Sequence, residues 1–172
     1  AAAALAEIQY PPVAVAICAY RRDSVGHALD GFGMLVPQRE SRNILGTIFS
    51  STLFANRAPS ESVLLTTFVG GMRQPELARL DDNEIAALVQ DEHATLLGAP
   101  ARAEFVHVRR WARAIPQYTF GHLARIGAIE DAERRFPGLF FCANYRGGVA
   151  IGDCIKSARR ATDEVVTFLR GE

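Results

Sequence analysis

The stretch PGLFFCANYRGGVAIGDCIKSARRATDEVVTFL, Pro137–Leu169, says most about the fold. Residues 139–143 form a continuous apolar run behind a Pro-Gly pair, which predicts a strand buried on both faces. After Gly147 and Gly148, apolar residues recur at three- and four-residue steps over 149–168, which predicts an amphipathic helix. The first turn of such a helix has unpaired N–H groups and a partial positive charge. The junction is therefore either a ligand-binding loop or a plain tight turn, because glycine serves both.

Upstream of this stretch, five short segments are apolar or alternating and rich in β-branched and aromatic residues. Charged or Gly/Pro-containing turns separate them, as expected between strands. The segments are Val13–Tyr20, Gly31–Pro37, Ile44–Ser51, Ser62–Gly70 and Ala103–Trp111. They predict a mostly antiparallel sheet.

Three helices are expected besides the C-terminal one. Asp81 is a good N-cap, Glu84 follows it at capping-box spacing, and Gly98 ends that helix. A second helix is predicted from about residue 121 to 136, where proline closes it, and residues 1–10 favour helix until a Pro-Pro pair. The fold class is α+β, with a mostly antiparallel sheet and helices followed by a C-terminal strand-helix unit.

Composition narrows the function classes. The chain has 172 residues, 49% of them hydrophobic and 22% charged, with no net charge, so neither disorder nor a broad nucleic-acid surface is indicated. The longest apolar run, residues 11–19, is too short to span a bilayer, and no signal peptide is expected at the start. We therefore expect ligands to bind in pockets of a folded domain.

The cysteines and histidines suggest no catalytic centre. Cys18, Cys142 and Cys154 lie far apart, and two of them fall in predicted buried elements, so buried reduced thiols are expected rather than disulfides or a metal site. The four histidines lack metal-ligand spacing, and no nucleophile elbow or Cys-His pairing points to a hydrolase.

Five segments together resemble the C-terminal part of the FAD-dependent protoporphyrinogen oxidases, within the amine-oxidase-like flavoprotein superfamily. They are YPPVAVAICAYRRD, LDGFGMLVPQRESRNILGTIFSS, FANRAPSESVLLTTFVGGMRQPEL, WARAIPQYTFGHLARI and PGLFFCANYRGGVAIGDCIKS, in one order and register. The resemblance covers essentially the whole chain and corresponds to roughly the last third to two fifths of such an enzyme.

The resemblance also implies a domain organisation. Residues 1–115 would form the substrate-binding sheet region, and residues 116–172 a helix and a strand-helix unit that complete the FAD-binding domain. The N-terminal G-x-G-x-x-G turn that holds the FAD pyrophosphate does not occur in this sequence. The family's membrane-facing helical part and the arginine assigned to a substrate carboxylate are missing too.

Leu35, Ile48 and Phe68 match the apolar positions that clamp the tetrapyrrole in the family. A large porphyrinogen ring suits apolar walls with few polar contacts. The alternative for an apolar strand residue is ordinary core packing.

Gly148, Val149 and Ala150 match a flavin contact, where backbone at a helix N-terminus approaches the isoalloxazine. Such a terminus stabilises the negative charge that a hydride brings to the flavin. Asp153, in the same first turn, is interpreted as serving the helix dipole.

The WARAIPQY segment carries further expectations. Trp111 matches a position near the flavin, and its alternative is a packing role at a strand end. Gln117 and Tyr118 would lie in the turn leading back to the flavin and could face either cofactor or backbone.

The activity implied by the resemblance is oxidation of protoporphyrinogen IX to protoporphyrin IX by hydride transfer to FAD, which O₂ reoxidises, in haem biosynthesis. No side chain is expected to act as a general base, and the isolated chain is expected to be inactive. Alternatives are coproporphyrinogen III oxidation by the same chemistry, a non-catalytic tetrapyrrole-binding or interaction module, and a relative that oxidises amines or carotenoids. Expected partners are the porphyrinogen, O₂, the N-terminal portion of the enzyme and a second copy in a homodimer, but no nucleic acid. A cytoplasmic location, peripheral at the membrane, is expected.

Overall fold

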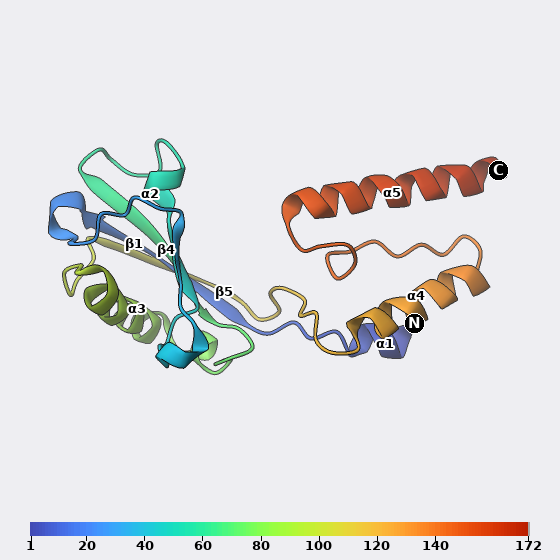
Figure 1. The fold of residues 1–172 in the computed structure, drawn as a ribbon, viewed down its shortest axis with the longest axis horizontal. Coiled ribbons are helices and arrows are strands. Elements are labelled where there is room, and N and C mark those ends of the chain that lie inside the picture. Colours follow the sequence, from blue (N-terminus) through green and yellow to red (C-terminus); the bar gives the residue numbers. More distant parts are fainter. Residues whose placement is uncertain (172) are drawn as a thin grey trace. The chain divides into compact units, whose positions relative to one another are not determined.

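The structure, a computed structural model, describes residues 1–171 and divides into two compact units (Figure 1). The sheet unit comprises Pro11–Ala114. The helical unit combines Ala1–Tyr10 with the chain from Ile115 onward. The first ten residues thus pack with the C-terminal part of the chain, whereas the domain division at 115/116 expected for a complete enzyme stays a prediction.

The sheet unit contains a five-stranded antiparallel sheet in the order β2-β3-β4-β1-β5. The strands are β1 (Val13–Arg21), β2 (Gly33–Leu35), β3 (Gly46–Phe49), β4 (Ser62–Gly70) and β5 (Phe105–Trp111). Each lies within or at the predicted segment, so the antiparallel sheet is confirmed. The short elements are η1 (Arg22–Ser24), η2 (Gln38–Glu40), α2 (Ser50–Leu53) and η3 (Leu77–Arg79).

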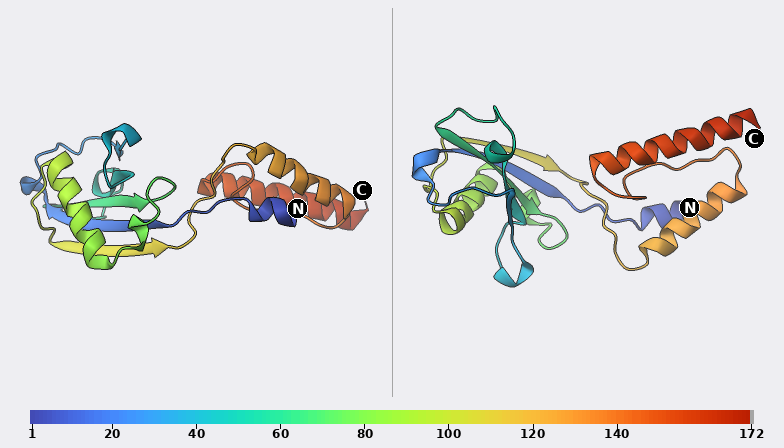
Figure 2. Two further views of the ribbon diagram at one scale, coloured as in Figure 1. Left: turned by 90° about the horizontal axis from the view of Figure 1, so that it is seen from below. Right: turned by 45° about the horizontal axis from the view of Figure 1, so that its top comes forward.

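One face of the sheet is covered by α3 (Asp82–Leu97), as Figures 1 and 2 show. Asp81 accepts hydrogen bonds from the N–H groups of Asn83 and Glu84, and the Glu84 carboxylate accepts one from the Asp81 N–H, which is the predicted capping box. Gly98 ends the helix in the left-handed conformation. Side chains of the core between α3 and the sheet include Tyr20, Leu65, Val69, Ile85, Val89 and Leu97.

The helical unit is built from α1 (Ala2–Ala6), α4 (His122–Arg135) and α5 (Ile151–Arg170). Its core is small: Ile8, Ile129 and Tyr145 are buried, and a few apolar residues of α1, α4 and the following loop pack on them. The helices predicted for 121–136 and for the C-terminus are confirmed, whereas the one predicted for residues 1–10 ends at Ala6, before the Pro-Pro pair.

The predicted strand at residues 139–143 is wrong. This segment is irregular and joins no β-ladder, and Leu139 remains 37% exposed. An apolar run becomes a buried strand only where neighbouring strands satisfy its backbone. The described part of the helical unit contains no strand that could pair with it.

The missing strand at residues 139–143 also affects the prediction that two of the cysteines are buried. Cys18 is fully buried, and burial raises its thiol pKa to about 11. Cys142 is exposed and Cys154 half-buried. The expectation of two buried cysteines therefore fails at Cys142, because the strand that would have buried it does not form.

In the described residues we find no helix with the length and apolar character needed to cross a membrane.

Candidate functional site

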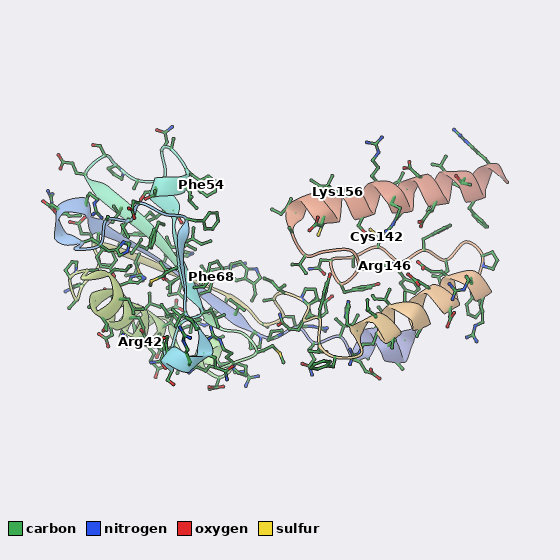
Figure 3. All side chains as sticks on the ribbon, in the orientation of Figure 1. Arg42, Phe54, Phe68, Cys142, Arg146 and Lys156 are labelled. Carbon is green, nitrogen blue, oxygen red and sulfur yellow. The ribbon has the colours of Figure 1, made fainter. Side chains whose placement is uncertain are left out.

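The face of the sheet opposite α3, here called the open face, carries the three residues predicted to clamp a tetrapyrrole. Along a strand, successive side chains point to opposite faces. Met34, Thr47 and Thr67 point to the α3 side, so Leu35, Ile48 and Phe68 point to the open face. Phe68 is labelled on β4 in Figure 3.

Strand register brings these residues together. Leu35 pairs with Gly46, which on its other side pairs with Phe68, while Ile48 pairs with Thr66. Gly46 permits this arrangement, because a β-carbon placed there would lie 2.5 Å from the Met34 carbonyl oxygen. The three apolar side chains therefore occupy adjacent strands β2, β3 and β4.

None of the three belongs to the buried core. Leu35 is 89% exposed, and Ile48 and Phe68 are half-buried. Ordinary core packing was the alternative for these positions, and their exposure argues against it. Their contact with a substrate stays a prediction.

The open face continues to β5, where Trp111 points the same way. Val13 pairs with Gly70 of β4 on one side and with Trp111 on the other. Trp111 is 45% exposed, so it is not a core packing residue, and the guanidinium of Arg109 lies over its ring at 5.9 Å.

A chain of hydrogen bonds lies directly beneath the open face, on the α3 side. The Thr47 and Thr67 hydroxyls are 2.9 Å apart, Thr67 Oγ1 is 2.7 Å from His93 Nε2, and His93 Nδ1 is 3.0 Å from the Tyr20 hydroxyl. All four side chains are almost completely buried. Burial lowers the pKa of His93 to about 4, so the ring is neutral at pH 7.

These polar contacts fix the two strands that carry Ile48 and Phe68. Thr47 and Thr67 are directly opposite each other in the β3–β4 pair, and α3 holds Thr67 through His93. The sequence places His93 on a helix, as observed, but gives no sign of its partners. The only available signal was a histidine on the apolar side of an amphipathic helix.

The second predicted site lies in the helical unit, at the start of α5. Gly147 and Gly148 have φ of 85° and 123°, conformations that favour glycine, and Ala150 is the N-cap without a side-chain hydrogen bond. Val149 and Ala150 are exposed. The first turn of α5 thus offers an uncapped helix N-terminus beside a glycine pair.

Two polar side chains define this helix start. The Tyr118 hydroxyl accepts a hydrogen bond from the Gly148 N–H at 3.2 Å and donates one to the Asn144 carbonyl at 3.0 Å. Asp153 is so close that a β-carbon on Gly148 would lie 2.5 Å from its Oδ2. Tyr118 thus contacts backbone groups, and the Gln117 side chain likewise donates to the Ile115 carbonyl. Whether either residue also contacts a cofactor stays a prediction.

The loop before α5 also takes part in a cluster of charged side chains that the sequence did not predict. Arg146 donates to Glu130 at 3.1 Å and to Glu133 at 2.9 Å, and Glu133 also accepts from the Phe141 N–H. The cluster joins the loop to α4. Nothing in the sequence pairs these two acidic residues with an arginine beyond the helix.

The helical unit also contains a groove of about 700 Å³ between α4, residues 137–140 and α5. Phe140 and Phe168 line it together with several charged side chains. No residue predicted for cofactor or substrate binding contributes to its walls.

The sequence of this chain matches the family model for flavin containing amine oxidoreductase over residues 1–166. The chain belongs to this flavin-containing family. Similar curated proteins include the mitochondrial protoporphyrinogen oxidase of Nicotiana tabacum, 39% identical over 166 residues, which cover 95% of this chain and 33% of that protein. Coproporphyrinogen III oxidase of Propionibacterium freudenreichii is 34% identical, over 96% of this chain and 31% of the relative.

Solved structures agree in fold. A putative protoporphyrinogen oxidase from Exiguobacterium superposes with a TM-score of 0.78 at 22% identity, covering 96% of this chain and 36% of the other. Reduced UDP-galactopyranose mutase gives 0.72 at 9% identity, over 99% of this chain and 36% of that one. This chain spans about a third of the length of the proteins it matches, which confirms its resemblance to one part of a flavoenzyme.

Proposed function

We propose that this chain provides the substrate-binding sheet and the flavin-contacting helix start of a protoporphyrinogen oxidase that uses FAD and O₂. The observation that carries the proposal is the row of apolar side chains on the open face. Leu35, Ile48 and Phe68 lie on three adjacent strands and outside the core. Such a surface suits one side of a large, mostly apolar ring.

In the proposed enzyme, the residues of the open face bind and orient the porphyrinogen without moving protons. Leu35 and Phe68 flank Gly46, where the sheet presents no side chain, so the ring can lie close to the strands. The hydroxyls of Ser50 and Thr66, 2.7 Å apart, satisfy each other beside Ile48. Each of these two hydroxyls thereby has a hydrogen-bond partner.

Gly148, Val149 and Ala150 are proposed to contact one edge of the isoalloxazine. Their fit rests on the exposed backbone at the uncapped N-terminus of α5. FAD, when bound, supplies the acceptor for the hydride. The helix terminus contributes a fixed partial positive charge that costs no rearrangement as negative charge develops.

The remaining portion of the enzyme is the proposed partner. It would supply the dinucleotide-binding turn and strands beside residues 139–143. The exposed apolar side chains of α5 support this, since Ile151 is 82%, Ile155 65% and Leu169 75% exposed. The homodimer, the cytoplasmic location and the peripheral membrane association expected from the resemblance stay predictions.

Anaerobic mixing tests this function. The complete enzyme carrying this chain would be mixed with protoporphyrinogen IX, and flavin absorbance and porphyrin fluorescence would be followed before and after O₂ is admitted. Bleaching of the flavin by substrate and its return with O₂ are expected. A flavin that stays oxidised with every porphyrinogen would contradict the proposal, and a purified protein without flavin would favour a non-catalytic binding module.

A second candidate substrate is coproporphyrinogen III. The similarity to coproporphyrinogen III oxidase favours including it. The two substrates share the ring and differ in their carboxylates, so the apolar row serves both. The ratio of kcat/KM for the two porphyrinogens, measured with one enzyme preparation, assigns the substrate.

A further inference from the structure

Arg109 occupies the open face in the same row as the proposed tetrapyrrole contacts. It pairs with Val15, Val15 pairs with Phe68, and Phe68 pairs with Gly46 beside Leu35. Adjacent strands are about 4.8 Å apart, so Phe68 and Arg109, two strands apart, are separated by about 10 Å. Val15 is an almost completely buried apolar residue between them.

Among the described residues, Arg109 differs from the other strand arginines in having no acidic partner. Arg21 forms ion pairs with Asp23 and Glu61, and Arg110 forms one with Asp82. Arg109 is exposed and forms no ion pair with any residue of the described 1–171. The strands themselves contain neither Asp nor Glu.

The geometry of the side chain favours binding in a defined position. The Arg109 guanidinium lies over the Trp111 ring at 5.9 Å, which holds it on the open face. The next residue, Arg110, points to the α3 side and donates to the Leu80 carbonyl. A planar guanidinium held beside an apolar surface is suited to bidentate binding of a carboxylate.

We propose that Arg109 binds an ionised side-chain carboxylate of the tetrapyrrole whose ring lies over Leu35 and Phe68. This inference rests on the proposed function and adds a specificity-determining residue to it. The ligand would be an amphipathic anion with an apolar ring on β2–β4 and a carboxylate at β5. Arg109 would then bind a substrate carboxylate in addition to the family arginine, which this chain lacks.

The test compares charged and neutral substrates in the complete enzyme. Arg109→Gln, Arg109→Lys and the control Arg110→Gln, which removes the same charge from the other face of β5, are assayed with the porphyrinogen and with its methyl ester. We expect Arg109→Gln to raise KM for the free acid on the order of tenfold, as for a lost hydrogen bond to a charged group. The KM for the ester and kcat should change little, and lysine should restore part of the affinity.

Three outcomes would overturn the inference. These are an unchanged KM for the acid in Arg109→Gln, an equal loss with the ester, or an equal loss in Arg110→Gln. A fall in bound FAD confined to Arg109→Gln would identify a flavin contact instead and also overturn it. If the wild-type enzyme oxidises no porphyrinogen, the proposed function itself fails, a result that differs from a wild type that is active and a variant that is unchanged.

Discussion

The imidazole Nε2 of His93 lies 2.7 Å from the hydroxyl of Thr67, and this single contact ties α3 to the strand that presents Phe68 on its other face. The other ring nitrogen meets the Tyr20 hydroxyl, so both are engaged. A neutral ring can donate at one nitrogen and accept at the other, whereas a protonated ring only donates. Both partners are hydroxyls that can accept from either form, so burial is what favours the neutral ring.

The sheet unit should lose stability in acid because of His93. Its folded pKa of about 4 is below the ordinary value of 6.5, so its contribution is complete above about pH 6.5 and is lost as pH falls toward 4. The loss amounts to about 3 kcal/mol. Denaturant unfolding followed by the fluorescence of Trp111, the one tryptophan of the chain, measures it.

The matched variants are His93→Gln and His107→Gln. His107 is exposed on β5 and serves as the control. The slope of stability between pH 6.5 and 4 should flatten in His93→Gln and persist in His107→Gln. The same slope in all three proteins would show that the acid sensitivity has another source.

Phe68→Ala should affect substrate handling more than folding. Phe68 is half-buried, so its loss should cost less than the roughly 2–5 kcal/mol of a buried Leu→Ala change. In the complete enzyme we expect KM for the porphyrinogen to rise several-fold, with a small change in melting temperature. Leu65→Ala, fully buried on the α3 side of the same strand, is the control and should show the reverse pattern. Unchanged kinetics with a collapsed melting temperature would place Phe68 in the core.

Gly148→Val should disturb the start of α5, whereas Val149→Ala should be mild. Gly148 has a φ of 123°, and a β-carbon there would meet Asp153 at 2.5–2.7 Å; Val149→Ala leaves the backbone N–H in place. In the complete enzyme, FAD occupancy and the rate of anaerobic flavin bleaching should both fall in the glycine variant. Wild-type FAD occupancy and bleaching rate in Gly148→Val would show that the glycine pair forms an ordinary turn.

A companion variant separates crowding by Asp153 from contact with the flavin. Gly148→Val combined with Asp153→Gly removes every Asp153 side-chain atom that a β-carbon on Gly148 would meet and keeps the added bulk. If flavin contact matters, occupancy should remain low in the double variant. Full recovery of occupancy would assign the defect to the Asp153 side chain.

Tyr118→Phe should loosen the loop before α5. It removes one hydroxyl that bonds both the Gly148 N–H and the Asn144 carbonyl, contacts worth about 1 kcal/mol each. Faster amide hydrogen exchange at Gly148 is expected, with exchange in β1 and β4 unchanged. Equal protection of Gly148 in both proteins would contradict the bridging role.

The 172-residue chain alone should bind FAD weakly or not at all. It lacks the dinucleotide-binding turn that holds the pyrophosphate, and its helix start would touch only one edge of the flavin. Titration monitored by flavin fluorescence tests this. Submicromolar affinity would mean that the chain contains a more complete site than the one described.

The elements that sequence reasoning predicted correctly are those with local signals. The Asp81 capping box and the closing Gly98 predicted α3, and short apolar segments rich in β-branched residues predicted β1 and β4. The strand at 139–143 failed because pairing is not a property of the run itself but of its neighbours.

The site was predictable only in part for the same reason. Leu35, Ile48 and Phe68 were assigned by resemblance, and the strand register then placed them on one face. The His93 contacts and the Arg146 cluster join residues 26 to 73 and 13 to 16 positions apart, respectively. Hydrophobic periodicity within one helix or strand cannot reveal contacts between residues so far apart in the sequence.

The division of the chain into units has a consequence for engineering. The two ends of the sheet unit meet, because the Ala114 N–H donates to the Pro11 carbonyl at 3.0 Å, and the Gln117 N–H likewise donates to the Gln9 carbonyl at 2.9 Å. The sheet unit is thus an insertion with adjoining ends, which is the arrangement that tolerates transplantation. Under the proposed function, substrate preference could be exchanged between relatives by replacing this unit at two junctions, one before Pro11 and one after Ala114.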